Sequence, residues 1–299
     1  MGSISKIITE LRLPITVSVP AYLMDHRFDG VTVMPAVEAM QILAASVRTV
    51  FPDIRVRTIR NAIFEKFLYI EPGSRMFSAF CDLTRYENGE VAARLQTKFR
   101  SGRSAITRLK EHASLCFSAQ RAQGGAGVSP MQPDPGELTI APERIYRELV
   151  PFGLSYHNIA EPITLFRSGV RAVVRAAELA GNGVLPELLG SPFPLDAAFH
   201  AACVWGQRFG GMVAFPVGFE CREIVLPTRP GGLYHAVVTP LPPQGAGILT
   251  FDLRIETLSG ECCEAVWGVR MRDVSSGQIK PPAWITISHE GNHESVFSQ

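Results

Sequence analysis

The sequence predicts an α+β fold made of two similar halves, each with one buried helix and a run of antiparallel strands. Three observations predict it: two helical segments that are apolar around most of their circumference, strands of alternating polarity joined by short turns, and one Gly- and Pro-rich segment between the halves. A helix that is apolar on most sides must be covered on most sides, and a sheet that curls around it supplies that cover.

The first half, residues 1–118, contains the first of these helices at residues 35–51. Its apolar residues recur at helical spacing: Val37, Met40, Ala44, Val47 and Phe51. Pro35 opens the segment, and proline suits a first helical turn because its missing N–H would have had no partner there. Strands are predicted at residues 75–83 and 91–99, and the Asn88-Gly89 step between them is a strong signal for a hairpin.

The second half, residues 139–299, has the same order of elements. Its helix is predicted at residues 195–209, directly after Pro192 and Pro194, and the strands follow at 213–227, 233–240, 248–258 and 262–274. The segment between the halves, residues 119–138, is rich in Gly and Pro and nearly free of large apolar side chains. Such a composition is typical of a linker, so we expect it to separate two halves that are each of ordinary domain size.

Composition excludes several classes of protein. The 29 Lys and Arg against 28 Asp and Glu leave a formal charge of +1 over 299 residues, so no strong field attracts nucleic acid or an anionic membrane. No run of about 18 uncharged apolar residues predicts a membrane helix. The six cysteines are scattered without zinc-ligand spacing. A chain of this size needs no disulfides, so we expect reduced thiols and a cytoplasmic protein.

One local pattern suggests a catalytic base. His26, Gly30 and Pro35 form an H-x3-G-x4-P run just before the first helix. A histidine there lies near the free N–H groups of a helix N-terminus, which suit a carbonyl oxygen that gains negative charge. A neutral imidazole can also take a proton near neutral pH. By spacing alone, the pattern favours a loop histidine that is hydrogen-bonded locally.

A second pattern pairs a carboxylate with an imidazole. Asp196 and His200 stand at i and i+4, on one face of the second helix. Because buried ionisable groups are costly unless paired, the two are expected to serve each other or a ligand. Asp196 as a helix N-cap is the alternative. A carboxyl at this place can act as an acid only if desolvation, worth about 3 pKa units, outweighs a helix dipole worth about 1 kcal/mol.

Taken together, these residues resemble the paired motifs of polyketide synthase dehydratase domains, which have a double hot-dog fold. Other segments fit the same family in order and distance: residues 111–114 resemble its His-Ala strand segment, Gly153 to Tyr156 resemble its Gly-x-x-Tyr segment, and residues 251–274 resemble its closing hairpin. The resemblance covers most of the chain. It implies that His26 is the general base and Asp196 the general acid, facing each other across a tunnel.

The resemblance also implies supporting roles. His200 would orient the acid, the hydroxyl of Tyr156 would lie near it, Pro35 would set the helix start, and Gly30 would let the backbone approach the substrate, with a nearby N–H polarising the thioester carbonyl. The chain departs from the family where Gly-Pro usually follows the tyrosine, because His157 and Asn158 stand there. His157 is equally compatible with a place in the pocket and with a simple loop position.

The implied activity is elimination of water from a β-hydroxyacyl thioester on an acyl carrier protein, in polyketide or fatty-acid-type synthesis. The carrier's phosphopantetheine arm would bring the substrate, and no metal or other cofactor would be needed. The family is also expected to be homodimeric. Two alternatives stay open: a product-template-like aldol cyclase of the same fold, and an inactive scaffold that binds acyl carriers.

Overall fold

The computed structural model describes residues 5–64, 66–100, 107–120, 138–178, 186–242, 245 and 247–286. Most of the predicted linker lies outside these residues, so the domain boundaries at 118 and 139 stay a prediction. None of the described helices is long and apolar enough to cross a membrane. All six cysteines are described, and none is in a disulfide.

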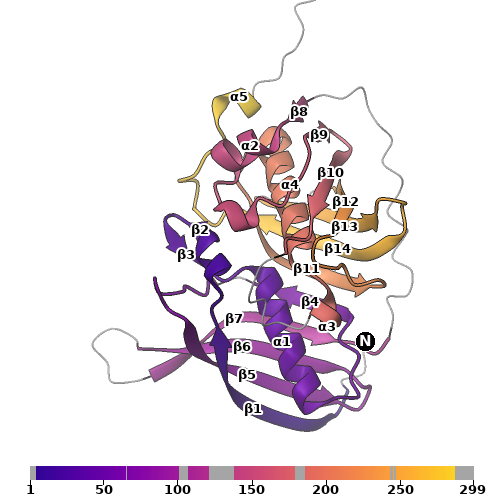
Figure 1. Cartoon of the computed structure of the whole chain (residues 1–299). Helices are drawn as coiled ribbons and strands as arrows, with labels where there is room; N and C mark the ends of the chain where they lie inside the picture. Colours follow the sequence, from indigo (N-terminus) through magenta and orange to yellow (C-terminus); the bar gives the residue numbers. More distant parts are fainter. Residues whose placement is uncertain are drawn as a thin grey trace, which may run out of the picture.

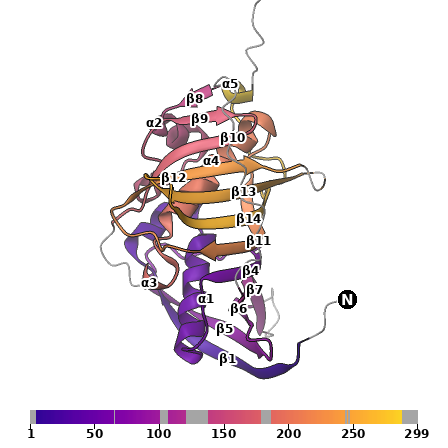
Figure 2. The same ribbon diagram turned by 90° about the vertical axis from the view of Figure 1, so that its right-hand side faces the viewer.

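One antiparallel sheet of 12 strands runs the length of the molecule (Figure 2). Five strands of the first half come first, in the order β1 (Ile7–Ser18), β5 (Met76–Tyr86), β6 (Val91–Arg100), β7 (Thr107–Phe117) and β4 (Thr58–Ile63). Seven of the second half follow: β11 (Phe215–Ile224), β14 (Cys262–Arg272), β13 (Ile248–Thr257), β12 (Leu233–Pro240), β10 (Gly169–Arg175), β9 (Ile163–Phe166) and β8 (Leu138–Ile140). The pairing of β4 with β11 therefore joins the two halves.

Two long helices lie on one side of this sheet, α1 (Ala36–Val50) in the first half and α4 (Phe193–Phe209) in the second (Figure 1). Each half is thus a sheet wrapped around one helix, which is the double hot dog that the resemblance implies. The smaller elements are η1 (Ala21–Asp25), the hairpin of β2 (Arg27–Phe28) and β3 (Val31–Thr32), α2 (Pro142–Arg144), the π-helix η2 (Ile145–Leu149), η3 (Leu154–Tyr156), α3 (Pro186–Leu189) and α5 (Ala283–Thr286).

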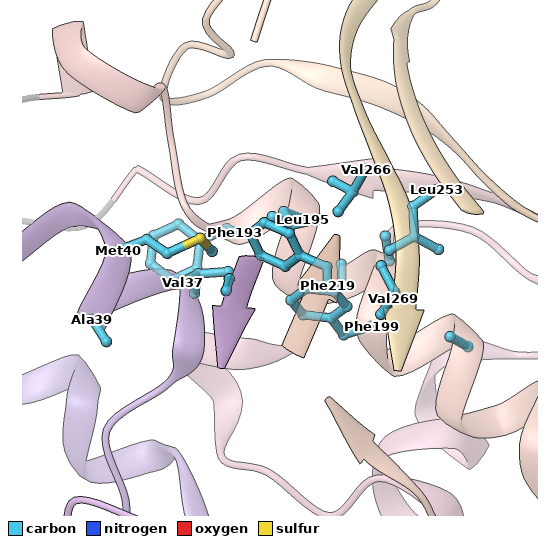
Figure 3. Packing of buried hydrophobic residues seen from close by; sticks show 14 of the residues in the cluster. Val37, Ala39, Met40, Phe193, Leu195, Phe199, Phe219, Leu253, Val266 and Val269 are labelled. Atoms are coloured by element: carbon cyan, nitrogen blue, oxygen red, sulfur yellow. The ribbon is translucent and has the colours of Figure 1, made fainter. Parts of the chain in front are cut away.

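The two helices meet through their N-terminal turns. Figure 3 shows Val37 and Met40 of α1 beside Phe193 and Leu195 of α4, and all four side chains are buried. The apolar circumference of α4 is explained by this packing, because the helix contacts α1 at one end and β10, β12 and β13 along its length. The first turns of both helices, and the residues just before them, are therefore brought to the junction of the halves.

The predicted elements match the structure closely, with two informative differences. The second helix begins at Phe193, two residues before the predicted start, so Pro194 lies in its first turn instead of preceding it. In β6, Phe99 lies on the exposed side although it stands in phase with the buried Val91, Ala93 and Leu95. The pairing with β7 shifts register here, because Leu95 faces Ala113 while Gln96 faces Glu111, so His112 of β7 is the extra residue of a bulge. Gln96 is buried and Phe99 is 40% exposed.

Candidate active site

His26 is held between η1 and β3 by three hydrogen bonds. Its backbone N–H donates to the carbonyl of Leu23 at 3.1 Å, and its own carbonyl accepts from the N–H of Val33 at 2.9 Å. Its ring Nδ1 lies 2.9 Å from the Val33 carbonyl oxygen. Since a carbonyl can only accept, Nδ1 must carry the proton, and Nε2 is left with a free lone pair. The imidazole is therefore oriented as a base.

Two aromatic rings enclose this imidazole. Phe152 stacks on it with ring centroids 4.3 Å apart, and Tyr156 lies 5.0 Å away. Burial lowers the pKa of His26 below its usual 6.5, and the nearby Asp196 only partly opposes this effect. The histidine is therefore neutral at physiological pH, the form that can accept a proton.

Asp196 and His200 project from the first turns of α4 and are 5% and 4% exposed. Asp196 is not the helix N-cap, because Pro192 holds that position and no side chain caps the helix. Instead, Asp196 Oδ2 lies 3.1 Å from His200 Nε2. The contact is not aligned as a hydrogen bond, so both atoms keep unused bonding capacity inside the protein. A substrate hydroxyl can take up that capacity.

His26, Asp196 and His200 line one cavity of about 80 Å³. Most of the remaining wall is apolar, and the residues that form it include Met34, Ala39, Leu68, Val150, Phe152, Phe199, Phe215 and Met271. Phe152 contacts both imidazoles, since its ring centroid is also 5.1 Å from that of His200. The structure thus brings an imidazole from the first half and a carboxyl from the second half to a single small, largely apolar cavity.

Tyr156 lies beside this cavity and is completely buried. Its hydroxyl has no hydrogen-bond partner among the described residues. Burial raises the pKa of Tyr156 well above its usual 10, and the charges of Glu38 and Asp196 act in the same direction. The phenol therefore stays protonated and within electrostatic reach of the carboxyl, which agrees with the position implied by the resemblance.

Three other predicted residues lie at the edge of the site. Pro35 is the N-cap of α1, so it sets the helix start as expected. Gly30 does not line the cavity. With Asp29 at φ +50° and Gly30 at φ +75°, it forms the tight turn of the β2–β3 hairpin, which accounts for the glycine without a substrate contact. The same tight turn positions the strand that carries the Val33 carbonyl.

His157 is exposed and does not line the cavity. Of its two predicted positions, the structure therefore places it in the loop. Its Nε2 hydrogen-bonds to the carbonyl of Phe152 at 2.9 Å, and its ring stacks on Tyr146 at 4.1 Å. The Tyr146 hydroxyl accepts from the N–H of Ile159 at 2.9 Å and lies 3.5 Å from His200 Nδ1. His157 thus supports a tyrosine that orients His200.

Sequence reasoning missed the residue that joins the two halves of the site. Asp25 precedes His26 and accepts hydrogen bonds from Ser155, at 3.0 Å from the backbone N–H and 2.6 Å from the hydroxyl. Its carbonyl also accepts from the N–H of Gly153 at 2.8 Å. These three bonds fix the loop that contains Asp25 and His26 against the turn that carries Phe152 and Tyr156. Both partners, Gly153 and Ser155, lie in the predicted Gly-x-x-Tyr segment. The segment alone does not indicate that they bind Asp25.

Replacing Gly153 with alanine is expected to lower kcat/KM by about tenfold, because a small displacement of a reacting group is costly. A Cβ at Gly153 would lie 2.5 Å from the carboxyl carbon of Asp25, so the two loops must separate. Steady-state kinetics should show the loss mainly in kcat. Leu154→Ala is the matched control, since that neighbouring side chain is 81% exposed and should be silent. Equal kinetics for both variants would contradict the positioning role.

His112 was expected only as part of a strand, yet it lines the cavity as well. Its Nε2 lies 2.8 Å from the Thr97 hydroxyl, and its Nδ1 lies 3.1 Å from the carbonyl of Phe67. Burial lowers the pKa of His112, so it is neutral and bridges β6 to the loop at residues 66–67. Both ring nitrogens of His112 have hydrogen-bond partners, so this histidine forms part of the cavity wall and has no free nitrogen to act as a base. In the described part of the chain, no group of three His, Cys, Asp or Glu residues could hold a metal ion.

Comparison with known proteins agrees with this architecture. No protein-family model matches the chain, and no match was found among curated proteins. Among solved structures, a trans-AT polyketide synthase dehydratase domain from Brevibacillus brevis is 18% identical with a TM-score of 0.66, over 90% of this chain and 95% of that one. The dehydratase domain of the CurJ module of curacin polyketide synthase is 16% identical with a TM-score of 0.67, over 91% and 93%.

A third structure is the bifunctional dehydratase-cyclase domain from ambruticin biosynthesis. It is 15% identical with a TM-score of 0.61, and the match covers 88% of this chain and 91% of that one. Nearly the full length of each domain is matched, with both halves included. At these identities the likeness defines the fold, and the chain therefore has the double hot-dog fold of polyketide synthase dehydratase domains.

Proposed function

We propose that this protein eliminates water from a β-hydroxyacyl thioester to give an α,β-unsaturated thioester. The observation that carries the proposal is the shared cavity: a neutral imidazole and a buried carboxyl line one small apolar space, and each comes from a different half. Elimination needs two proton transfers at adjacent carbons, which a base and an acid on opposing walls can perform. A reversible reaction implies that the same site would also hydrate the unsaturated product.

The base would act through the free nitrogen of His26. Its Nε2 takes the proton from the α-carbon while Nδ1–H remains bonded to the Val33 carbonyl at 2.9 Å. That bond stabilises the imidazolium that forms, because a carbonyl oxygen is a good partner for a charged donor. The electrons of the broken C–H bond form the new double bond. The N-terminus of α1 lies close in sequence to the base and would favour the thioester oxygen as it gains negative charge.

The acid would be Asp196. Its carboxyl donates a proton to the β-hydroxyl, and the C–O bond breaks to release water. His200 Nε2 lies 3.1 Å from Asp196 Oδ2, and the Tyr146 hydroxyl lies 3.5 Å from His200 Nδ1. The carboxyl must start protonated for this step. Proton transfer from the imidazolium back to the carboxylate, directly or through the product water, restores both groups.

The remaining expectations are proposals of the same kind. An acyl carrier protein would deliver the thioester on its phosphopantetheine arm, as the double hot-dog architecture suggests. The reaction requires no redox cofactor or metal, because only protons and water are exchanged. We also propose a homodimer that works in the cytoplasm. Size-exclusion chromatography with light scattering tests the dimer directly.

Product analysis separates this proposal from its two alternatives. With a β-hydroxyacyl pantetheine thioester as substrate, mass spectrometry should detect a product that is lighter by about 18 mass units, the mass of one water molecule. An aldol cyclase would instead form a ring from an unreduced poly-β-keto chain. The cavity of about 80 Å³ argues against folding such a chain beside His26. Absence of any turnover by the wild-type protein, together with carrier-protein binding, would favour the scaffold.

The pH dependence of kcat/KM should report the protonation of the His26 imidazole in the free enzyme. Burial lowers the pKa of His26 from its usual 6.5. Protonation removes the base only below that lowered pKa, so activity should persist at pH 6.5 and fall at a more acidic pH. Rates from pH 5 to 8 on a saturable thioester substrate test this expectation. An acid limb with its midpoint above 6.5 would contradict the buried, neutral histidine.

A further inference from the structure

A second cavity lies between β1 and α1, which run side by side in the first half (Figures 1 and 2). Its volume is about 470 Å³, well within the range of small-molecule sites. The wall is mostly apolar and includes Leu13, Ile15, Val17, Leu23, Ile42, Ala45 and Val50. Met34 lines both this cavity and the one that contains His26. Met34, a residue with a flexible side chain, therefore borders both spaces.

The difference in volume indicates where an acyl chain can go. An apolar cavity of about 150 Å³ accommodates a molecule the size of benzene. The catalytic cavity of about 80 Å³ is smaller and has room for the reacting carbons only. The rest of a longer chain must continue beyond it. The neighbouring cavity offers the necessary length and an apolar wall, and a change of rotamer at Met34 would connect the two.

One carboxyl group lines this mostly apolar space. Glu38, in the first turn of α1, is 3% exposed. Its Oε1 accepts a hydrogen bond from the Tyr22 hydroxyl at 2.9 Å. This hydrogen bond engages Oε1 only. Burial raises the pKa of Glu38 to about 7. A carboxyl with so little exposure in a mostly apolar wall gains free energy when a ligand adds a hydrogen bond.

The chemistry of the wall limits what that ligand group can be. The residues that line the cavity include no Lys, Arg or His, so the carboxyl has no internal counter-ion. The protonated form donates a hydrogen bond and the ionised form accepts one. A hydroxyl group can hydrogen-bond to either form of the carboxyl, because it can both donate and accept a hydrogen bond. Glu38 also acts electrostatically on Tyr156 and Asp196, which places it near the catalytic carboxyl.

We propose that the cavity between β1 and α1 receives the distal part of the acyl chain, and that Glu38 and Tyr22 select chains with a hydroxyl group there. The inference rests on the proposed dehydratase function, since it names the substrate class of that site. It assigns to Glu38 a role in specificity, separate from the proton transfers at His26 and Asp196. Polar recognition inside an apolar wall discriminates well, because the analogue that lacks the hydroxyl leaves a buried group unpaired.

Kinetics with two matched substrates test the proposal. The probes are two β-hydroxyacyl pantetheine thioesters of equal length, one with an extra hydroxyl near its far end and one without. We expect the wild-type kcat/KM to favour the hydroxylated probe by about tenfold, and Glu38→Leu to abolish the preference. Glu38→Gln should keep part of it. Glu10→Gln removes an exposed carboxyl from β1 and should leave the preference intact. An unchanged preference in Glu38→Leu would overturn the proposal.

Binding measurements distinguish this inference from the proposed reaction. Saturated acyl pantetheines, which cannot eliminate water, are titrated by calorimetry in the same hydroxylated and unhydroxylated pair. Tighter binding of the hydroxylated analogue without turnover of either substrate would overturn the dehydratase function and keep the inference. Turnover without any preference would do the reverse. Ala45→Phe narrows the cavity without touching Glu38, and it should weaken binding of long chains but not of short ones; equal effects on both would contradict chain binding here.

Discussion

Replacing His26 with alanine is expected to lower the rate of dehydration by about 10²–10⁴-fold, the usual contribution of a general base. The imidazole is the only base from the first half that reaches the cavity with a free ring nitrogen among the described residues, since both nitrogens of His112 are occupied. Its removal leaves the α-proton without an acceptor. Single-turnover measurements on a pantetheine thioester would give the chemical step directly.

Two further variants make this result specific. Asp196→Asn keeps the shape of the acid but cannot donate to the leaving hydroxyl in the same way, and it should cost a similar factor. Leu154→Ala removes a side chain that is 81% exposed and lies outside the cavity, and its effect should be much smaller. Normal turnover in His26→Ala or Asp196→Asn would remove the proposed roles. A melting curve for each variant shows whether the fold survives.

The sequence predicts the fold through its two apolar helices. The segments containing Met40 and Phe199 have no polar face wide enough for a surface helix, so each must be wrapped, and the structure wraps each with a sheet. The hairpin at Asn88-Gly89 follows from local turn chemistry and appears as predicted, and the strands predicted at 248–258 and 262–274 also pair as a hairpin. The apolar circumference of a helix and the residues of a turn are both local properties of the sequence. They can therefore be recognised without knowledge of the tertiary structure.

Strand β1 has a feature that the local sequence does not predict. Leu11, Leu13, Ile15 and Val17 alternate with outward residues, a period typical of a strand, but Pro14 stands among them and cannot donate to a sheet ladder. Proline is acceptable here because β1 is an edge strand of the sheet. Edge position is a property of the whole fold. The cavity between β1 and α1 could not be predicted for the same reason.

The site was predictable in part. His26, Asp196 and His200 carry their own signals, because ionisable groups beside apolar helices need an explanation. Asp25 and Tyr146 do not. Their roles depend on contacts with Ser155 and His200, which are 130 and 54 residues away in sequence. No spacing rule connects residues so far apart, so the groups that position a catalytic residue are harder to find than the residue itself.

Removing the charge of Glu264 is expected to lower the free energy of unfolding by about 3–5 kcal/mol, the usual effect of leaving one member of a buried ion pair alone. Arg222 of β11 and Glu264 of β14 are 1% and 2% exposed, and Arg222 Nε donates to Glu264 Oε2 at 2.6 Å. In Glu264→Gln the guanidinium stays buried without a counter-charge. Chemical denaturation with an unchanged m-value would measure the loss. A loss below about 1 kcal/mol would contradict the account.

The double variant Arg222→Met with Glu264→Leu should recover most of this loss, because two apolar side chains of similar volume replace a pair whose desolvation is costly. The pair also bears on how the halves depend on each other. Arg222 lies on the strand that joins β4, and its Nη1 reaches Met40 of α1 at 3.7 Å. Destabilisation at this junction should therefore lower the stability of both halves in one transition. Two separate transitions in Glu264→Gln would instead show that each hot dog unfolds alone.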